Sequence, residues 1–395
     1  MTGDINDDQA TERGPEPNMS GSGASGSGDH AGYAGSAISG GEGYAVANHS
    51  SIGQMLWIGF YTTLLNALTL TLFRFWGRTQ FRQRLWSDTL IDGEPIEYTG
   101  KGSELFFGFL LAIVVLGLPT LIFVFGAQLL FGPAGAGAIV GLLYLFIFVL
   151  IGMALFLARR YHLSRTRFRG LRFAQTGSVW GYGFAAFGYG LLTAVTLGWF
   201  APLARINLSK RKWNNAYYGS EKIRFEGTKD ARREPVYLSF ATAWIGAAAI
   251  FIGWGLALGI TAEGLDVDTV EENPAFIAQA ILTLIPALLA YGIIASWHEA
   301  VMIRRIAKSI HIDGGTLTSR IGAVDILLLA ITNTMLIVLT LGIGYMAAQM
   351  RRWRLIANEM SILGTIDFEA IQQSDAPLPS TGEGLVDGLD LTSDF

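Results

Sequence analysis

The sequence predicts an all-α polytopic membrane protein, built from tandem repeats of transmembrane hairpins and broken or re-entrant helices. Three observations predict this fold class: the composition, seven long apolar runs, and a short motif that recurs three times. Of the 395 residues, 51% are hydrophobic and 15% are charged, whereas about 25% of residues are charged in an ordinary soluble protein. A soluble fold of this size cannot bury so much apolar surface. The absence of cysteine excludes a disulfide framework, cysteine-ligated zinc and thiol catalysis.

Both ends of the chain have the composition of solvated tails. Residues 1–51 are rich in Gly, Ser, Ala and Asp, and residues 372–395 are acidic, with Gly, Pro, Ser and Thr between the acids. Such segments bury too little apolar surface to fold, so we expect disorder. The first segment contains one basic residue, Arg13, and no apolar core of a signal peptide, so we expect it to stay in the cytoplasm.

Seven apolar runs lie between the tails. They are residues 53–73, 105–131, 135–158, 180–204, 238–261, 275–297 and 323–348. An α-helix needs roughly 20 apolar residues to cross the hydrocarbon core, and each run is near or above that length. Length alone therefore predicts seven spans.

The basic residues argue against seven plain spans. Of 28 Lys and Arg residues, 27 lie in five segments: 74–104, 159–178, 205–236, 298–322 and the part after residue 350. The two remaining connections, about 127–137 and 262–274, contain none. Seven plain spans would put about half of the positive charge outside, which the positive-inside rule disfavours.

One topology places every basic segment on the cytoplasmic side of the membrane. Runs 105–131 and 135–158 form one transmembrane hairpin, and runs 238–261 and 275–297 form another. The other three runs enter and leave on the cytoplasmic side, because each has an internal Gly, Pro or Thr break where a half-inserted helix can turn back. All basic segments and both termini then lie on the cytoplasmic side of a bacterial inner membrane. Seven plain spans remain the alternative.

The break motif recurs in the three exceptional runs. It reads Thr69-Leu70-Thr71, Thr196-Leu197-Gly198 and Thr340-Leu341-Gly342. A basic, Trp-containing helical stretch and a short strand-like piece follow each copy, and two weaker copies of helix, Gly turn and strand follow the hairpins. The strand pieces are too small to be stable alone, so we expect them to gather into a small cytoplasmic sheet or cap.

These repeats predict a modular organisation. The predicted parts are a tail (1–51), a first membrane module (52–178), a second module (179–322), a partial third repeat (323–371) and an acidic tail (372–395). Tandem duplication explains this order, and copies of the repeat from several chains can also assemble into a homo-oligomer.

At these residues the chain resembles the YjgN-like family of bacterial inner-membrane proteins, a domain family of unknown function. The resemblance rests on Asn333 followed by Thr340-Leu341-Gly342, on Thr193 followed by Thr196-Leu197-Gly198, and on the basic residues and Gly-containing strand ends that come next. It covers about residues 53–370. The first copy departs from it, with Thr71 where the others have Gly. The resemblance implies a multi-pass inner-membrane protein and supplies no catalytic residues.

Two sets of residues are candidates for a site. A polar path where the broken helices meet would be lined by Asn66, Thr69, Thr193, Thr196, Asn333 and Thr340. The alternative is that these side chains bond locally to backbone freed at the breaks. A basic face for lipid headgroups would comprise Arg78, Arg82, Arg205, Lys210, Arg211, Arg351 and Arg352. The position of these residues beside membrane runs favours lipid over nucleic acid as the partner.

Other motifs favour structural explanations. His298-Glu299 would suit a proton relay or a metal site, but the sequence favours an interfacial pair at a helix end, since the other histidines lack metal-ligand spacing. The carboxylates of Asp88, Asp92, Glu94 and Glu97 fit a solvated charged surface better than an acid/base pair, with Asp92-Gly93 as a tight turn between helix and strand. We expect no enzyme activity, no cofactor and no metal.

Two functional hypotheses remain. The first is passage of a small molecule or lipid across the membrane, or sensing of it, at the junction of the broken helices, because repeated modules with discontinuous helices are one way to build a midplane site. The alternative is a non-transporting scaffold whose basic cytoplasmic face binds anionic lipid or protein partners.

Overall fold

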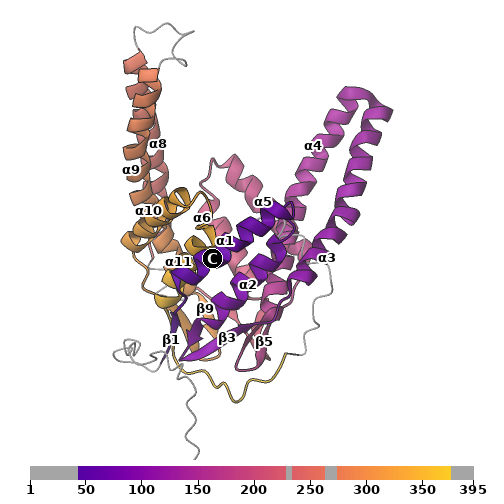
Figure 1. Ribbon diagram of the computed structural model, residues 1–395, viewed down its shortest axis with the longest axis vertical. Helices are drawn as coiled ribbons and strands as arrows, with labels where there is room; N and C mark the ends of the chain where they lie inside the picture. The colour runs from indigo at the N-terminus through magenta and orange to yellow at the C-terminus, as the bar shows by residue number, and fades with distance from the viewer. Residues whose placement is uncertain (1–42, 228–233, 263–273, 375–395) are drawn as a thin grey trace, which may run out of the picture. The chain divides into compact units, whose positions relative to one another are not determined.

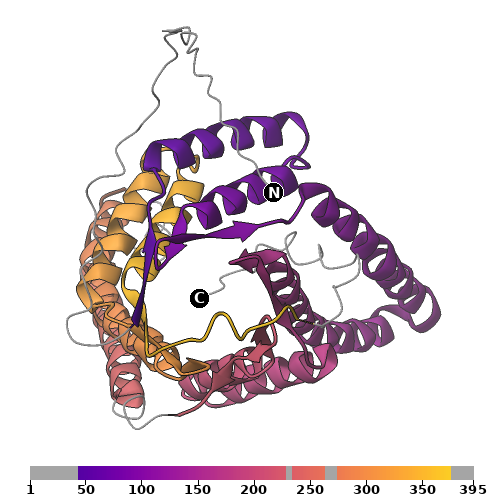
Figure 2. The same ribbon diagram turned by 90° about the horizontal axis from the view of Figure 1, so that it is seen from below.

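Short strands from all parts of the chain form one antiparallel sheet, so the prediction of an all-α protein is wrong. The computed structural model describes residues 43–227, 234–262 and 274–374. Within them, eleven strands are ordered β7-β6-β5-β4-β3-β2-β1-β11-β10-β9-β8 (Figure 2). The strands are β1 Gly43–Asn48, β2 Thr89–Ile91, β3 Glu94–Tyr98, β4 Thr166–Phe168, β5 Leu171–Gln175, β6 Ala216–Tyr218, β7 Glu221–Lys222, β8 Arg224–Phe225, β9 Ile310–Ile312, β10 Gly315–Ser319 and β11 Met360–Leu363.

The two ends of this sheet meet in a single short segment. Lys222 of β7 pairs with Tyr217 of β6, and Arg224 of β8 pairs with His311 of β9. Only Ile223, which is buried, separates β7 from β8. The strand order therefore closes on itself within residues 221–225, which leaves little unpaired edge in the described sheet. The small cap expected from the sequence is a nearly closed ring of strands.

The N-terminal strand completes the ring. β1 lies between β11 and β2, with Ala45 opposite Ser361 and Val46 opposite Ile91. The predicted tail extended to residue 51, whereas residues 43–48 form this strand. Residues 1–42 of that predicted tail lie outside the described residues, as does most of the predicted acidic tail.

Tight turns join the paired strands. Asp92 and Gly93 connect β2 to β3 with φ angles of 53° and 81°. Positive φ at both central residues is typical of a type I′ hairpin turn, for which Asp-Gly is a preferred pair. The predicted turn at Asp92-Gly93 is thus confirmed, but it joins two strands rather than a helix and a strand. Arg169-Gly170 makes the equivalent turn between β4 and β5.

Each strand pair follows a pair of helices. The helices are α1 Ile52–Leu68, α2 Arg74–Ser87, α3 Gly102–Ala112, the π-helix η1 Ile113–Gly117, α4 Leu118–Arg165, α5 Val179–Val195, α6 Ala201–Trp213, α8 Val236–Ala262, α9 Pro274–Ala307, α10 Ala323–Leu339 and α11 Tyr345–Asn358 (Figure 1). α1 packs on α2, α5 on α6, α8 on α9, and α10 on α11. α4 has a non-helical kink at Gly132, where φ is 65°. The two halves of α4 on either side of this kink form a hairpin, as Figure 1 shows.

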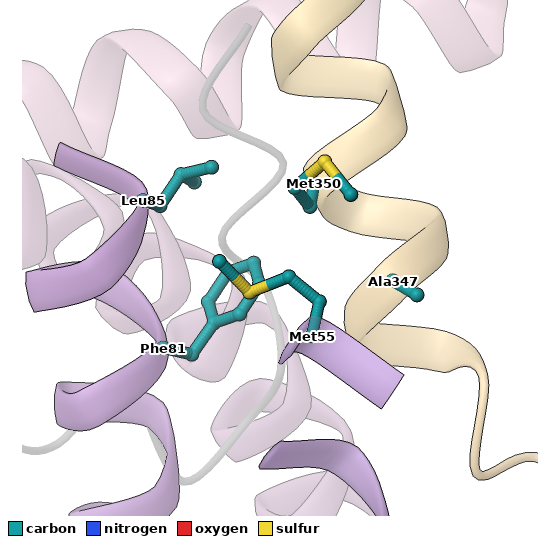
Figure 3. Packing of buried hydrophobic residues seen from close by; sticks show 5 residues of the cluster. All are labelled: Met55, Phe81, Leu85, Ala347 and Met350. Carbon is teal, nitrogen blue, oxygen red and sulfur yellow. The ribbon is translucent and has the colours of Figure 1, made fainter. Parts of the chain in front are cut away.

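Neighbouring helix pairs contact one another in the same order as the strands. α2 packs on α3, α4 on α5, α6 on α8 and α9, and α9 on α10, and α11 returns to pack on α1. Met55, Phe81, Leu85, Ala347 and Met350 form a buried cluster at this last contact (Figure 3). The first and last helices of the described chain are therefore held together by a common core.

The segment after β11 crosses the inside of the ring. Residues 364–374, which we call the strap, follow β11 and cross the middle of Figure 2 in yellow. Ile366 and Ile371 of the strap are buried with Phe168 and Tyr218. Burial raises the pKa of Tyr218 to about 12, so its hydroxyl stays protonated and donates to the carbonyl oxygen of Phe168 at 3.2 Å. The ring thus has an apolar plug.

Within the part of the chain that the structure describes, three helices are long and apolar enough to cross a membrane: Gly135–Arg165, Val236–Ile260 and Pro274–Ala307. Four shorter apolar helices, Gly102–Leu111, Leu118–Pro133, Val179–Val195 and Ala323–Leu339, accompany them. Large apolar side chains such as Leu256, Ile260 and Leu282 are exposed on α8 and α9. Apolar surface of this extent is typical of helices whose solvent is lipid.

The predicted internal breaks in the three exceptional runs are confirmed. The first helix of each pair ends at Leu68, Val195 or Leu339, and a five-residue turn leads into the second helix. In each turn a threonine hydroxyl donates to the carbonyl oxygen four residues earlier at 2.7 Å and accepts from the backbone N–H four residues later. These threonines are Thr69, Thr196 and Thr340. The turn backbone is therefore satisfied locally.

The first of these turns carries strain that the other two avoid. Thr71 has a φ of 71°, whereas Gly198 and Gly342 occupy the same place at 93° and 90°. A residue with a Cβ in this left-handed region costs roughly 1–2 kcal/mol, and a branched Cβ is especially unfavourable there. We expect Thr71→Gly to leave the free energy of unfolding unchanged or to raise it by about 1 kcal/mol, despite the added backbone freedom of the unfolded chain.

Thermal unfolding in detergent checks this expectation, with Gly342→Thr as the reverse substitution. Gly342→Thr is expected to destabilise, because it creates the strain that Thr71 has now. Destabilisation by Thr71→Gly would contradict the strain.

Candidate anion-binding cavity

A cavity of about 600 Å³ lies among the helices next to the sheet. Its walls come from α1, α2, α6, α11 and the C-terminal part of α4, and Ile96 of β3 and Phe173 of β5 contribute on the sheet side. This volume is within the range of about 300–1,000 Å³ that is usual for small-molecule sites. The cavity brings together segments that lie up to about 300 residues apart in the sequence.

Three arginines of α2 line one side of the cavity. Arg74, Arg78 and Arg82 follow one another at intervals of four residues, so they share a helix face. A rise of 1.5 Å per residue spaces their Cα atoms about 6 Å apart along the helix axis. We call these three residues the arginine ladder.

Two further arginines reach the cavity from other helices. Arg159 of α4 is buried and Arg352 of α11 is exposed, and both line the cavity. None of the described residues that line it is Asp or Glu. Arginine presents donors in a fork that matches carboxylate and phosphate oxygens. The five arginines among its lining residues make the cavity a candidate site for an anion.

Tryptophans hold the walls in place. Trp86 of α2 stacks on Trp353 of α11, with ring centroids 5.1 Å apart and planes 9° from parallel. The indole N–H of Trp86 donates to the hydroxyl of Thr166, and that of Trp353 donates to the hydroxyl of Thr89. The guanidinium carbon of Arg159 lies 4.4 Å from the ring centroid of Trp213. Trp213 thus holds the guanidinium group of Arg159, and the stack of Trp86 on Trp353 joins α2 to α11.

The structure separates the predicted polar-path residues. Asn66 lines the cavity, and its buried side-chain oxygen has no hydrogen-bond donor among the described residues. Thr193 donates to the carbonyl oxygen of Tyr189, and Asn333 donates to that of Ala348. The hydroxyls of Thr69, Thr196 and Thr340 serve the turns described above, and none of these three lines this cavity. The polar path stays a prediction, and these contacts match the alternative of local bonding to backbone.

The predicted basic face is also divided. Arg78, Arg82 and Arg352 line the cavity, whereas Lys210 and Arg211 are exposed at the end of α6. The remaining two have structural partners: Arg351 donates to the hydroxyl of Thr332, and Arg205 is ion-paired with Glu299. Sequence reasoning did not include Arg74 and Arg159 in the site. The four-residue spacing from Arg74 to Arg82 was a signal for the first of them.

His298 and Glu299 have structural partners rather than a catalytic arrangement. Nδ1 of His298 lies 3.0 Å from the hydroxyl of Ser239, and Glu299 accepts two hydrogen bonds from Arg205, at 2.5 and 2.7 Å. Among the described residues, no group of three or more His, Asp or Glu is placed to hold a metal ion. The contacts of the pair fit the interfacial explanation.

The bond between Arg205 and Glu299 joins α6 to α9, so we expect Glu299→Gln to weaken the fold. Loss of a charge-assisted pair that is about one-third exposed should cost about 1–2 kcal/mol. Thermal unfolding in detergent measures this cost, and Arg205→Lys, which keeps the charge but loses the fork, should give a smaller loss. Equal stability of Glu299→Gln and the unmodified protein would contradict a structural role for the pair.

In the acidic group near β2 and β3, the side chain of Glu94 is 48% exposed, whereas that of Asp88 is 13% exposed. Asp88 pairs with Arg84 at 3.2 Å, and Glu94 pairs with Arg169 at 2.6 Å. Their partners are cations rather than a second carboxylate, so no acid/base pair is formed by these described contacts.

The fold and the cavity together define a class of protein. Apolar helix pairs, some of them long enough to cross a membrane, surround a cavity lined by arginines. The helices are connected to a nearly closed antiparallel sheet. The chain belongs to the family described as "Bacterial protein of unknown function (DUF898)", whose model matches residues 44–388. This is the YjgN-like family, so the resemblance noted in the sequence is confirmed. No curated protein and no solved structure matches the chain.

Proposed function

We propose that the protein is a multi-pass protein of the bacterial inner membrane that senses an anionic small molecule or lipid by binding it in the cationic cavity. The observation that carries the proposal is the convergence of Arg74, Arg78, Arg82, Arg159 and Arg352 on one cavity. Arginine presents donors in a fork that matches phosphate and carboxylate oxygens, so this set of side chains suits an anionic ligand.

The sheet supports a single cytoplasmic side for the basic residues. Each of the five basic stretches leads into a strand: α2 into β2, the end of α4 into β4, α6 into β6, the end of α9 into β9, and α11 into β11. All of these strands belong to one sheet. A single sheet lies on one side of a membrane, so the basic stretches share that side, and the positive-inside rule makes it the cytoplasm. Both ends of the described chain then lie there, because β1 and the strap contact the same sheet.

The geometry favours sensing over passage. A polar path through the membrane would need Thr69, Thr196 and Thr340 to face a common opening, but their hydroxyls bond within their own turns. The cavity is instead lined by arginines, which bind anions tightly and slow their release. Retention of a ligand suits a sensor better than a conduit.

Binding can be measured directly on the full-length protein in a neutral detergent. We expect inorganic phosphate, glycerol phosphate or a short-chain anionic phospholipid to raise the unfolding temperature of the unmodified protein, since a ligand at about 100 times its Kd adds about 2.7 kcal/mol of stability. The double variant Arg78→Gln and Arg82→Gln should abolish this rise.

Lys210→Gln with Arg211→Gln is the matched control, because it removes the same charge from exposed positions of α6. An unfolding temperature that no anion raises, or an equal rise in both double variants, would overturn the proposal. The scaffold alternative differs, because its basic face includes the exposed Lys210 and Arg211: anionic lipid would then bind the control variant weakly as well.

A further inference from the structure

We infer that the strap is a detachable latch across the ring of strands, and that its docking is coupled to the occupancy of the cavity. The detachment follows from how the strap is attached to the ring. The coupling follows from two side chains that line the cavity and also pack against the apolar cluster of the strap. The coupling rests on the proposed function, because it gives the sensor an output, whereas the detachment stands without it.

The strap can leave the ring without breaking the sheet. It begins after Leu363, the last residue of β11, and none of the strand pairs among the described residues includes a residue of 364–374. It is also the last segment that the structure describes, so its movement displaces no later described element. A terminal segment without strand pairs opens at a lower free energy than the sheet that it covers.

Hydrogen bonds fasten the strap to turns on both sides of the ring that it crosses in Figure 2. The N–H of Asp367 donates to Oδ2 of Asp313, in the β9–β10 turn, at 3.1 Å. The N–H of Gln372 donates to the hydroxyl of Ser220, in the β6–β7 turn, at 3.1 Å, and the carbonyl oxygen of Gln372 accepts from the N–H of Ser220 at 2.7 Å. These four residues are exposed, so water can replace the bonds when the strap leaves.

Apolar side chains provide the attachment between these turns. Ile366 and Ile371 are 6% and 9% exposed and are buried with Phe168 and Tyr218. The ring centroid of Phe368 lies 5.9 Å from that of Phe168. Since only three apolar side chains of the strap make this contact, its release exposes far less apolar surface than the opening of the whole ring.

Gly364 is the hinge between β11 and the strap. Its φ is 108°, and a Cβ at this position would lie 2.3 Å from the carbonyl oxygen of Gly314. A side chain here forces the backbone to move, so Gly364→Ala should push the strap out of its docked position. Gly364 neither lines the cavity nor belongs to the apolar cluster, so this substitution leaves both surfaces intact.

Ile96 of β3 and Phe173 of β5 connect the strap to the cavity. Both line the cavity, and both pack against the cluster that contains Ile366 and Ile371. Side chains that border an unfilled cavity lack packing partners on that side, and a bound molecule supplies them. A ligand therefore holds Ile96 and Phe173 against the strap and keeps the latch closed. By linkage, the closed latch raises the affinity of the cavity for the ligand by the same factor.

Thiol labelling of the full-length protein in neutral detergent tests the detachment, because the chain contains no cysteine of its own. Ile371→Cys reports on the strap, and Ala174→Cys is the matched control, since Ala174 is also buried but lies in β5, where it pairs with Tyr217. We expect N-ethylmaleimide to label Ile371→Cys at least about tenfold faster than Ala174→Cys, because the strap opens without the sheet. Gly364→Ala should accelerate only the labelling of Ile371→Cys.

Hydrogen exchange gives a second measurement that needs no substitution. The amide of Ser220 donates to the carbonyl oxygen of Gln372, so its protection depends on the docked strap. It should exchange faster than the amides of β5 that are bonded within the sheet.

Glycerol phosphate tests the coupling. At a concentration that raises the unfolding temperature, it should slow the labelling of Ile371→Cys by about tenfold, because it closes the latch. The slowing should be lost when Phe173→Ala is added and kept when Leu171→Ala is added. Leu171 packs against the same cluster as Phe173 but does not line the cavity, so it is the matched control.

The outcomes separate the latch, the coupling and the proposed function. Equal labelling rates of Ile371→Cys and Ala174→Cys, with equal exchange of the Ser220 and β5 amides, would overturn the latch. A raised unfolding temperature without slower labelling of Ile371→Cys would overturn the coupling and leave the sensor standing. Absence of any anion effect on the unfolding temperature would overturn the proposed function and the coupling together, and the labelling rates without ligand would still decide the latch.

Discussion

A chain that lacks residues 1–48 should lose the closed sheet, whereas a chain that lacks only residues 1–42 should keep it. β1 pairs on one side with β11 and on the other with β2, so its removal opens the ring and creates two new edges. Asn48 adds side-chain bonds to the carbonyl oxygen of Leu85 and the hydroxyl of Thr89, and its N–H donates to Asn358. Loss of these contacts should remove most of the about 5–15 kcal/mol of net stability that is usual for a folded domain.

Gel filtration and thermal unfolding in detergent distinguish the two deletions. The longer deletion should give aggregated protein or no cooperative transition, and the shorter one should unfold at the temperature of the full chain, because none of the described strand pairs uses a residue before Gly43. Asn48→Ala should be intermediate, since it keeps the strand and loses its buried side-chain bonds. Identical behaviour of the two deletions would mean that β1 does not close the sheet.

We expect Met350→Ala to lower the free energy of unfolding strongly. The side chain is fully buried between α1, α2 and α11, where it packs with Met55, Phe81, Leu85 and Ala347 (Figure 3). Truncation of a buried methionine typically costs about 2–5 kcal/mol, because the lost apolar contacts are accompanied by a cavity. Since this cluster joins the first and last helices, the loss also loosens the helix ring at its closing contact.

Met335→Ala is the matched control for this substitution. Met335 lies in the neighbouring helix α10, but its side chain is 57% exposed, so its truncation should change the unfolding free energy by no more than about 0.5 kcal/mol. Thermal or denaturant unfolding in the same detergent measures both variants. A Met350→Ala protein as stable as the Met335→Ala protein would show that the cluster is not a core.

Patterns within a few turns of helix were predictable from the sequence. The Thr-Leu-Gly motif contains what a break needs, namely a hydroxyl that bonds in both directions and a residue that accepts positive φ, and the structure has a break at each copy. Asp92-Gly93 likewise contains its own turn. The placement of basic residues after apolar runs was also visible, because charge and hydropathy are read directly along the chain.

The pairing of distant strands was not predictable in the same way. Each strand has between two and six residues, and its partners are chosen by hydrogen bonds between main chains, which look alike in every sequence. The strand at residues 43–48 belongs to a segment whose composition otherwise predicts disorder. It becomes a strand because it pairs with β2 on one side and with β11 on the other. Tyr44 and its partner Ile362 in β11 are more than 300 residues apart in the sequence.

The cavity, too, was predictable only where it depends on local sequence. The four-residue spacing from Arg74 to Arg82 places these arginines on one helix face, and the chain breaks at three threonines were also visible in local sequence. That Arg159 and Arg352 line the same cavity, and that Thr69, Thr196 and Thr340 do not, depends on tertiary contacts. Spacing within a helix is a local property, whereas convergence depends on how five helix pairs are closed into a ring by contacts between residues far apart in the chain.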